Sequence, residues 1–292
     1  MTTRRDFVTS MAAGVGALAL APSARSWAAL AKVPIMDRLG LQLWSVRDSM
    51  REDVAGTLAR VQALGFREIE AAGLWGQTAE EFRASLDKAG LRCQSAHMGL
   101  DRLKDDAASG FAEVTTLGAK HIVSPWIAHE GAFTREDALK AAESFNTIGA
   151  GAKAAGLRFS YHCHGYEFVP SDEGTLFDTL AQNTDPENVR FQIDVFWAKA
   201  GGVDPAALIA AYPGRMPLLH IKDMQKGVDF PVGTSGAPHE TNVPVGTGQI
   251  DWSGVFQAAA ASSTELFYIE DESPSVWEQL PQTLEYLRSF KA

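Results

Sequence analysis

The chain has 292 residues, of which 46% are hydrophobic, and a formal net charge of −10 at pH 7. The hydrophobic fraction is enough for a sizeable core, and the acidic balance argues against nucleic acid or an anionic membrane as a partner. The two cysteines, Cys93 and Cys163, both fall inside predicted strands. We expect them to be reduced core residues without a disulfide, even in the oxidising compartment predicted next.

Residues 1–28 are typical of a cleaved twin-arginine export signal. The paired arginines Arg4 and Arg5 precede a short apolar run, and the small residues Ser26 and Ala28 suit a signal peptidase. The apolar run is too short for a stable membrane span. We expect the twin-arginine export machinery to deliver the protein to the periplasm or the outside, and residues 29–292 to form the folded domain.

The mature part alternates short apolar runs with amphipathic helical stretches. The predicted strands are residues 40–44, 66–71, 92–97, 120–125, 158–164, 190–195, 217–223 and 266–271. Several helical stretches end in a glycine just before the next strand, at Gly65, Gly90 and Gly156, which is a helix C-cap signal. Eight strand–helix units without hairpin turns between them predict a parallel sheet. The length and the lack of a glycine-rich dinucleotide fingerprint favour one (β/α)8 TIM barrel over an open doubly wound sheet.

Polar residues gather at the carboxyl ends of these strands, where the chemistry of such barrels lies. They are Gln42, Trp44, Glu70, His97, His162, His164, Glu167, Gln192, Asp194, His220, Lys222 and Glu270. Several buried charges at one mouth are costly unless an ion compensates them, and a divalent cation would do so best. The carboxylates of Glu167, Asp194 and Glu270 with the imidazole of His220 would form a mixed oxygen and nitrogen site. Such a set suits one Mn²⁺ or Co²⁺, with Zn²⁺, Mg²⁺ and Fe²⁺ as alternatives.

Five segments carry a family resemblance: YHCHGYEF (161–168), IDVFWAKAGGVDP (193–205), LLHIKDM (218–224), VPVGTGQIDW (243–252) and YIEDE (268–272). In order and spacing they resemble the sugar phosphate isomerase/epimerase group of xylose isomerase-like barrels, over about residues 39–290. The resemblance implies one divalent metal held by Glu, Asp, His and Glu from strands five to eight. Asp194, His220 and Glu270 match the last three of these.

The first ligand stays open between three residues. Some relatives place this glutamate within the fifth strand, where this chain has His162, whereas the nearest glutamate is Glu167, a few residues on. We prefer Glu167 as the ligand, with His162 or His164 as the alternative. Residues of one strand two apart share a face. Both histidines are therefore expected to line the substrate side, as hydroxyl-binding groups or as a ligand.

Other strand-end residues have a functional and a structural interpretation. Lys222 is either an electrophile or proton donor near a substrate oxygen, or a structural partner of Asp223 or Glu270. The remaining candidates for the substrate side are His97, Glu70, Gln42, Trp44 and Trp197, although each tryptophan could also be a core residue.

Features outside the strand ends complete the predictions. His121, His129 and His239 are expected on the surface or in loops. The long, glycine-rich segment 226–249 is predicted to be a lid or binding loop, and Asp251 to cap the helix that follows.

These residues predict a metal-dependent enzyme acting on a carbohydrate. A divalent ion would chelate a carbonyl and the adjacent hydroxyl and stabilise an enediolate, while carboxylates such as Glu167 and Glu270 remove and return a proton from opposite sides. Isomerisation or epimerisation of a free sugar, keto sugar or glycoside would follow, because phosphorylated sugars are mainly cytosolic. A lyase that eliminates from a 3-keto sugar or glycoside, and a sugar-binding barrel without activity, are the alternatives. A metal-dependent endonuclease would need more histidines at the barrel mouth and a basic surface for DNA, and this sequence indicates neither.

Overall fold

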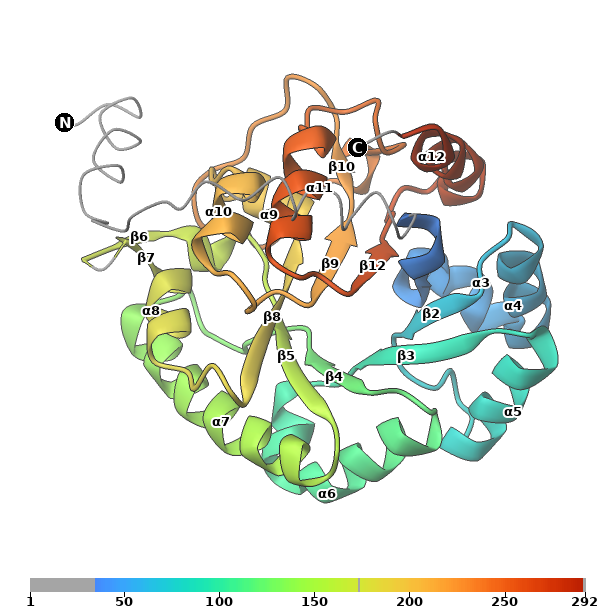
Figure 1. The fold of residues 1–292 in the computed structure, drawn as a ribbon, viewed down its shortest axis with the longest axis horizontal. Helices are drawn as coiled ribbons and strands as arrows, with labels where there is room; N and C mark the ends of the chain where they lie inside the picture. The colour runs from blue at the N-terminus through green and yellow to red at the C-terminus, as the bar shows by residue number, and fades with distance from the viewer. Residues whose placement is uncertain (1–34, 173, 291–292) are drawn as a thin grey trace.

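Eight parallel strands close into a barrel in the computed structural model, which describes residues 35–172 and 174–290 (Figure 1). The predicted export signal lies outside these residues. The barrel strands are β1 (Leu39–Gln42), β2 (Glu68–Ala71), β3 (Arg92–His97), β4 (His121–Ser124), β5 (Arg158–His162), β8 (Val189–Asp194), β9 (Leu218–Ile221) and β12 (Leu266–Ile269). Strand β1 pairs with β2 on one side and with β12 on the other, which closes the ring. The predicted (β/α)8 barrel is confirmed.

The helices surround the strands and cover their outer faces (Figure 1). They are α3 (Arg47–Glu52), α4 (Val54–Ala63), α5 (Ala79–Ala89), α6 (Leu100–Thr116), α7 (Arg135–Ala154), α8 (Leu176–Gln182), α9 (Val195–Ala200), α10 (Pro205–Ala211), α11 (Trp252–Ala261) and α12 (Val276–Ser289). Thr78 and Thr134 begin α5 and α7 with capping boxes, and Asp251 caps α11 as predicted. Gly90 ends α5 in the left-handed conformation, with φ of 70°.

The core confirms the prediction for the two cysteines and contains one histidine that was expected elsewhere. Cys93 and Cys163 are buried and unbonded, as predicted. His121, expected on the surface or in a loop, is instead the first residue of β4 and only 3% exposed. Burial lowers its pKa to about 4, so the imidazole stays neutral inside the barrel. The prediction failed because a strand this short has too little apolar context to show that its first residue is inside.

Two short antiparallel hairpins, which the sequence did not indicate, shape the loops: β6 (Pro170–Ser171) with β7 (Gly174–Thr175), and β10 (Asp223–Met224) with β11 (Asn242–Val243). The second hairpin folds the segment 226–249 back over the barrel mouth. Asp223 anchors its far end by accepting hydrogen bonds from the backbone N–H groups of Gly246 (2.9 Å) and Gly248 (3.1 Å). A Cβ at Gly248 would lie 2.1 Å from the Asp223 carboxylate, so this close approach requires glycine.

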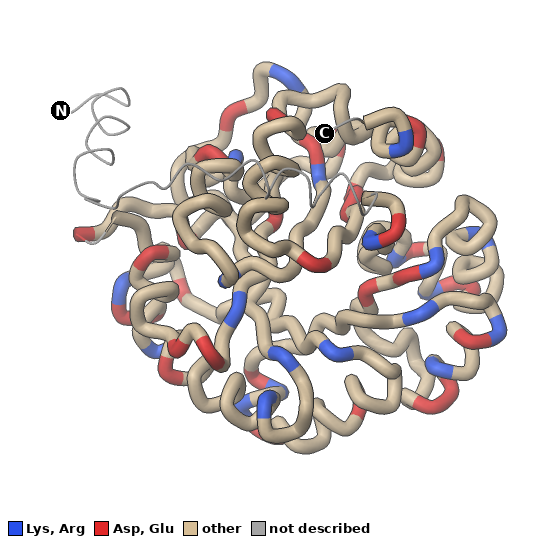
Figure 2. Tube along the Cα trace, in the orientation of Figure 1, with Lys and Arg blue, Asp and Glu red and all other residues tan. Residues whose placement is uncertain are grey.

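Charges of both signs are interspersed around the barrel (Figure 2). Within residues 35–172 and 174–290, no helix is both long and apolar enough to span a membrane.

Candidate active site

Four side chains from neighbouring strands meet at the carboxyl end of the barrel. His162 ends β5, Asp194 ends β8, His220 lies in β9 and Glu270 follows β12 directly. Each is buried, and one potential ligand atom from each lies within 4.8 Å of the others. The two imidazoles and two carboxylates supply the nitrogen and oxygen donors that a first-row divalent cation accepts. We refer to these four residues as the metal-site group.

Asp194 shows why this group fits a cation. Its Oδ1 caps helix α9 by accepting a hydrogen bond from the backbone N–H of Trp197 at 3.1 Å. Its Oδ2 is buried without a hydrogen-bond partner and lies 3.9 Å from Nδ1 of His220. Burial raises the pKa of this carboxyl to about 7. A buried carboxylate oxygen without a hydrogen bond is costly, and a cation between these side chains would satisfy it.

Glu70 of β2 holds the opposite side of the His220 ring. Its Oε2 lies 2.5 Å from Nε2 of His220, whereas Nδ1 of the same ring lies 3.0 Å from Oε2 of Glu270. Without a metal, burial alone would lower the pKa of His220, but the two carboxylates outweigh it and raise the pKa to about 10. Because Glu70 accepts a hydrogen bond from the Nε2–H of His220, Nδ1 is the atom left to face Asp194 and Glu270.

Glu70 is itself held by donors from several strands. Its carboxylate accepts hydrogen bonds from Gln42 (2.7 Å), Ser95 (2.6 Å) and Gln192 (2.7 Å), and Nε2 of His97 lies 3.1 Å away. Burial alone would raise the pKa of Glu70, but the charges of His97 and His220 and their hydrogen bonds hold it well below its usual value. Gln42 and Glu70, predicted on the substrate side, thus form a network beneath the metal-site group.

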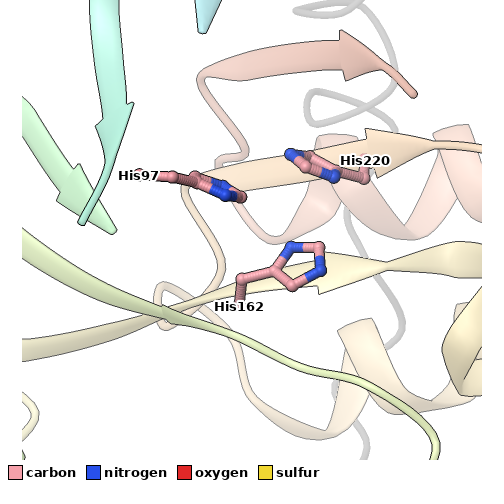
Figure 3. A group of neighbouring side chains, drawn as sticks. All are labelled: His97, His162 and His220. Carbon is pink, nitrogen blue, oxygen red and sulfur yellow. The ribbon is translucent and has the colours of Figure 1, made fainter. Parts of the chain in front are cut away.

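Three imidazoles converge at the same place (Figure 3), and His97, His162 and His220 form a second, overlapping group of potential ligands. The rings of His97 and His220 are stacked with centroids 5.5 Å apart, and those of His162 and His220 are 4.6 Å apart. The amide oxygen of Gln192 accepts hydrogen bonds from His97 (2.9 Å) and from Nδ1 of His162 (3.0 Å). The hydrogen bond from Nδ1 fixes the His162 tautomer and leaves Nε2 for the metal-site group.

Glu167 does not join this group, although it was our preferred first ligand. It lies past the end of β5 in a short 3-10 helix (Tyr166–Phe168), and its carboxylate accepts hydrogen bonds from the Tyr161 hydroxyl and the His164 backbone N–H. It is fully buried, and burial raises its pKa to about 7. The turn 163–168 directs Glu167 behind the strand, and His162, the alternative, takes the position beside Asp194 and His220.

Lys222 is a buried counter-charge beside the group. Its Nζ lies 2.6 Å from Oε1 of Glu272, 3.5 Å from Oε2 of Glu270 and 4.0 Å from Oδ2 of Asp194. Burial alone would lower the pKa of Lys222, but the charges of Glu270 and Glu272 raise it above its usual value, so the side chain stays protonated. Of the two predicted structural partners, Glu270 does pair with Lys222, whereas Asp223 is used by the loop. The nearest partner is Glu272, which sequence reasoning missed.

A cavity of about 760 Å³ opens above these residues. Of the predicted site residues, it is lined by Trp44, His97, His162, His164, Trp197 and Glu270. The segment 226–249 contributes Ser235–Ala237 and His239 to the wall, consistent with the predicted binding loop. Sequence reasoning missed Trp126, Arg102, Glu113 and Glu272 in this lining. A tryptophan two residues after β4 was the available signal for Trp126.

Comparison with known proteins agrees with this architecture. A family model described as "Xylose isomerase-like TIM barrel" matches residues 58–290. The chain belongs to this family. A crystal structure of a sugar phosphate isomerase/epimerase from Parabacteroides distasonis is 25% identical, with a TM-score of 0.70 over 86% of this chain and 93% of the other. The IOLI protein, whose crystal structure has a bound zinc atom, shares the fold at 16% identity and a TM-score of 0.65, over 86% of this chain and 96% of the other.

Curated relatives are two inosose dehydratases. The one from Geobacillus kaustophilus is 25% identical over 196 residues, covering 59% of this chain and 62% of the relative. The one from Clostridium tetani is 28% identical over 139 residues, covering 46% of each chain. The matched part of this chain thus spans less than two thirds of either relative. The proteins similar to this chain thus include both a sugar phosphate isomerase/epimerase and dehydratases.

Proposed function

We propose that this protein is a divalent-metal-dependent enzyme that removes the proton next to the carbonyl of a keto sugar or keto glycoside. The observation that supports this most is the buried Oδ2 of Asp194, which has no hydrogen-bond partner within the metal-site group at the base of the cavity. When bound, the ion would act as a Lewis acid on a carbonyl and a neighbouring hydroxyl. Mn²⁺ and Co²⁺ remain our preferred ions. With His162 as a ligand in place of Glu167, Zn²⁺ and Fe²⁺ become stronger alternatives, because imidazole suits these ions.

Two different walls of the cavity carry groups that would transfer protons. Imidazoles outside the metal-site group line the side of β3 and β5, at His97 and His164, whereas carboxylates follow β12, at Glu270 and Glu272. A carboxylate can take the proton from carbon, and an imidazole opposite can give one to a departing oxygen. This asymmetric pair suits β-elimination. The C–H electrons form a C=C bond, the β C–O bond breaks, and the leaving oxygen takes up a proton.

The two-carboxylate arrangement that we expected for epimerisation loses its support, because Glu167 is buried behind the strand. We therefore place the lyase first, in keeping with the dehydratases among the relatives. Isomerisation or epimerisation is the second candidate, supported by the similarity to the Parabacteroides protein over nearly its whole length.

The charges of the cavity favour an unphosphorylated substrate. Among the described residues that line it, Arg102 is the one lysine or arginine, and Glu113 occupies its guanidinium with two hydrogen bonds of 3.1 and 2.6 Å. A phosphate group would normally be met by unpaired arginine, lysine or backbone N–H groups. This agrees with the proposed export, since sugars outside the cytoplasm are mostly free or glycosidic.

The test is to incubate the metal-loaded protein with phenyl 3-keto-glucoside in D₂O and follow the reaction by NMR. Elimination is expected to release phenol, whereas deuterium incorporation into an intact glycoside would indicate the isomerase or epimerase. Asp194→Ala serves as the control, which should lose either activity together with the metal. If wild type causes neither change with any of the named ions, the proposal fails and a sugar-binding protein is the better explanation.

A further inference from the structure

The cavity extends well beyond the metal-site group. The four proposed ligands come from β5, β8, β9 and β12, which make up one half of the ring. The other half of the lining follows β2, β3 and β4 and includes Leu74, Met98, Pro125 and Trp126. A volume of about 760 Å³ lies in the range of pockets that enclose drug-sized molecules, which are larger than one sugar ring. We call the part lined by these four residues the distal compartment.

Trp126 is the notable side chain of the distal compartment. It is 38% exposed, and the described residues include only two other large apolar side chains that are exposed, Trp44 and Val232. Other rings hold the indole in place: His129 stacks on it at 5.6 Å, and Tyr166 and His164 meet it edgewise at 4.8 and 4.9 Å. A large aromatic surface that is fixed in orientation and left open to a cavity suits stacking against a flat ring.

His164 connects the distal compartment with the metal-site group. Its ring lies 4.9 Å from that of His162 on one side and 4.9 Å from Trp126 on the other. The His164 side chain lines the cavity between a sugar position and an aromatic platform, so it is well placed to contact the oxygen that joins two parts of a substrate.

We propose that the distal compartment is an aglycone subsite, which binds an aromatic ring of a glycoside against Trp126 with the glycosidic oxygen beside His164. The four side chains that define the distal compartment are apolar, and the neighbouring charges in the cavity lining, Arg102 and Glu113, are paired with each other. An uncharged aromatic aglycone therefore fits better than a phosphate or a second, strongly hydrated sugar ring. The substrate class is an aryl glycoside rather than a free monosaccharide. This inference rests on the proposed function for the position of the sugar ring.

The experiment measures binding of unoxidised glycosides, which lack the carbonyl needed for turnover. Isothermal titration calorimetry of the metal-loaded protein would compare phenyl with methyl glucoside, for both anomers. Wild type should bind a phenyl glucoside at least tenfold more tightly than its methyl counterpart. Trp126→Ala should remove this preference, and Trp126→Phe, which keeps an aromatic ring, should retain part of it. Trp277→Ala is the matched control, since this indole packs on the Arg60 guanidinium outside the cavity.

The possible binding results distinguish failure of the subsite from failure of the role given to Trp126. Equal binding of phenyl and methyl glucosides by wild type, or binding of neither, overturns the subsite. A phenyl preference that survives in Trp126→Ala, or that is lost equally in Trp277→Ala, overturns the role of Trp126. Because no turnover is required, a phenyl preference without any reaction of the keto glycoside would refute the proposed chemistry alone. Reaction without a phenyl preference would refute the subsite alone.

Discussion

Replacing Glu70 with glutamine tests whether this carboxylate positions His220 for the metal. The glutamine amide has one oxygen and one NH₂ group where the carboxylate has two acceptor oxygens. One of the two groups of donors, Gln42 with His220 or Ser95 with Gln192, would then face an NH₂ group. Losing a hydrogen bond to a buried charged group costs about 1.5–3 kcal/mol. Loss of an outer partner of a metal-binding histidine typically weakens metal binding by about 10–100-fold, or roughly 1.4–2.7 kcal/mol.

We expect Glu70→Gln to bind Mn²⁺, Co²⁺ or Zn²⁺ about 10–100-fold more weakly, as measured by calorimetric titration of the metal-free protein. Glu68→Gln is the matched control. Glu68 is buried two residues earlier in β2, but it pairs with Arg92 at the opposite end of the barrel, where both residues line a separate pocket. If Glu70→Gln binds the metal as tightly as the control, Glu70 does not position His220. Circular dichroism would verify that both variants keep the fold.

Three further predictions concern the metal and the export signal. Metal binding should release protons and weaken as pH falls. Below about pH 10 the ion must displace the proton held by His220, and below about pH 7 that of Asp194 as well. Calorimetry in buffers of different ionisation enthalpy measures the proton release, and a pH-independent affinity would contradict the prediction. His162→Ala should lose the metal while Glu167→Gln retains it by elemental analysis, and the reverse result would restore Glu167 as the ligand. Changing the paired N-terminal arginines to lysines should keep the protein in the cytoplasm, and unchanged export in cell fractionation would refute the signal.

Much of the fold follows from local sequence patterns. The regular alternation of apolar runs and amphipathic stretches predicted all eight barrel strands, and for residues 92–97 the predicted strand and β3 coincide. The helix ends could also be predicted from nearby residues, because the Asp251 cap and the left-handed Gly90 depend only on the neighbouring backbone. Because the carboxyl ends of parallel strands meet at one edge, the polar residues there could be predicted to gather. Asp194, His220 and Glu270 do lie together.

The sequence by itself determined the barrel, its catalytic end and most of the polar residues gathered there, because strand periodicity and chain order are local properties. Only the tertiary structure placed His162, and not Glu167, beside Asp194 and His220, since the turn after β5 directs the glutamate to Tyr161 and behind the strand. The joining of Glu70 to His220, 150 residues apart, likewise depends on closure of the ring. The exposed face of Trp126 depends on how separate loops pack over the mouth, and sequence spacing does not encode such long-range packing.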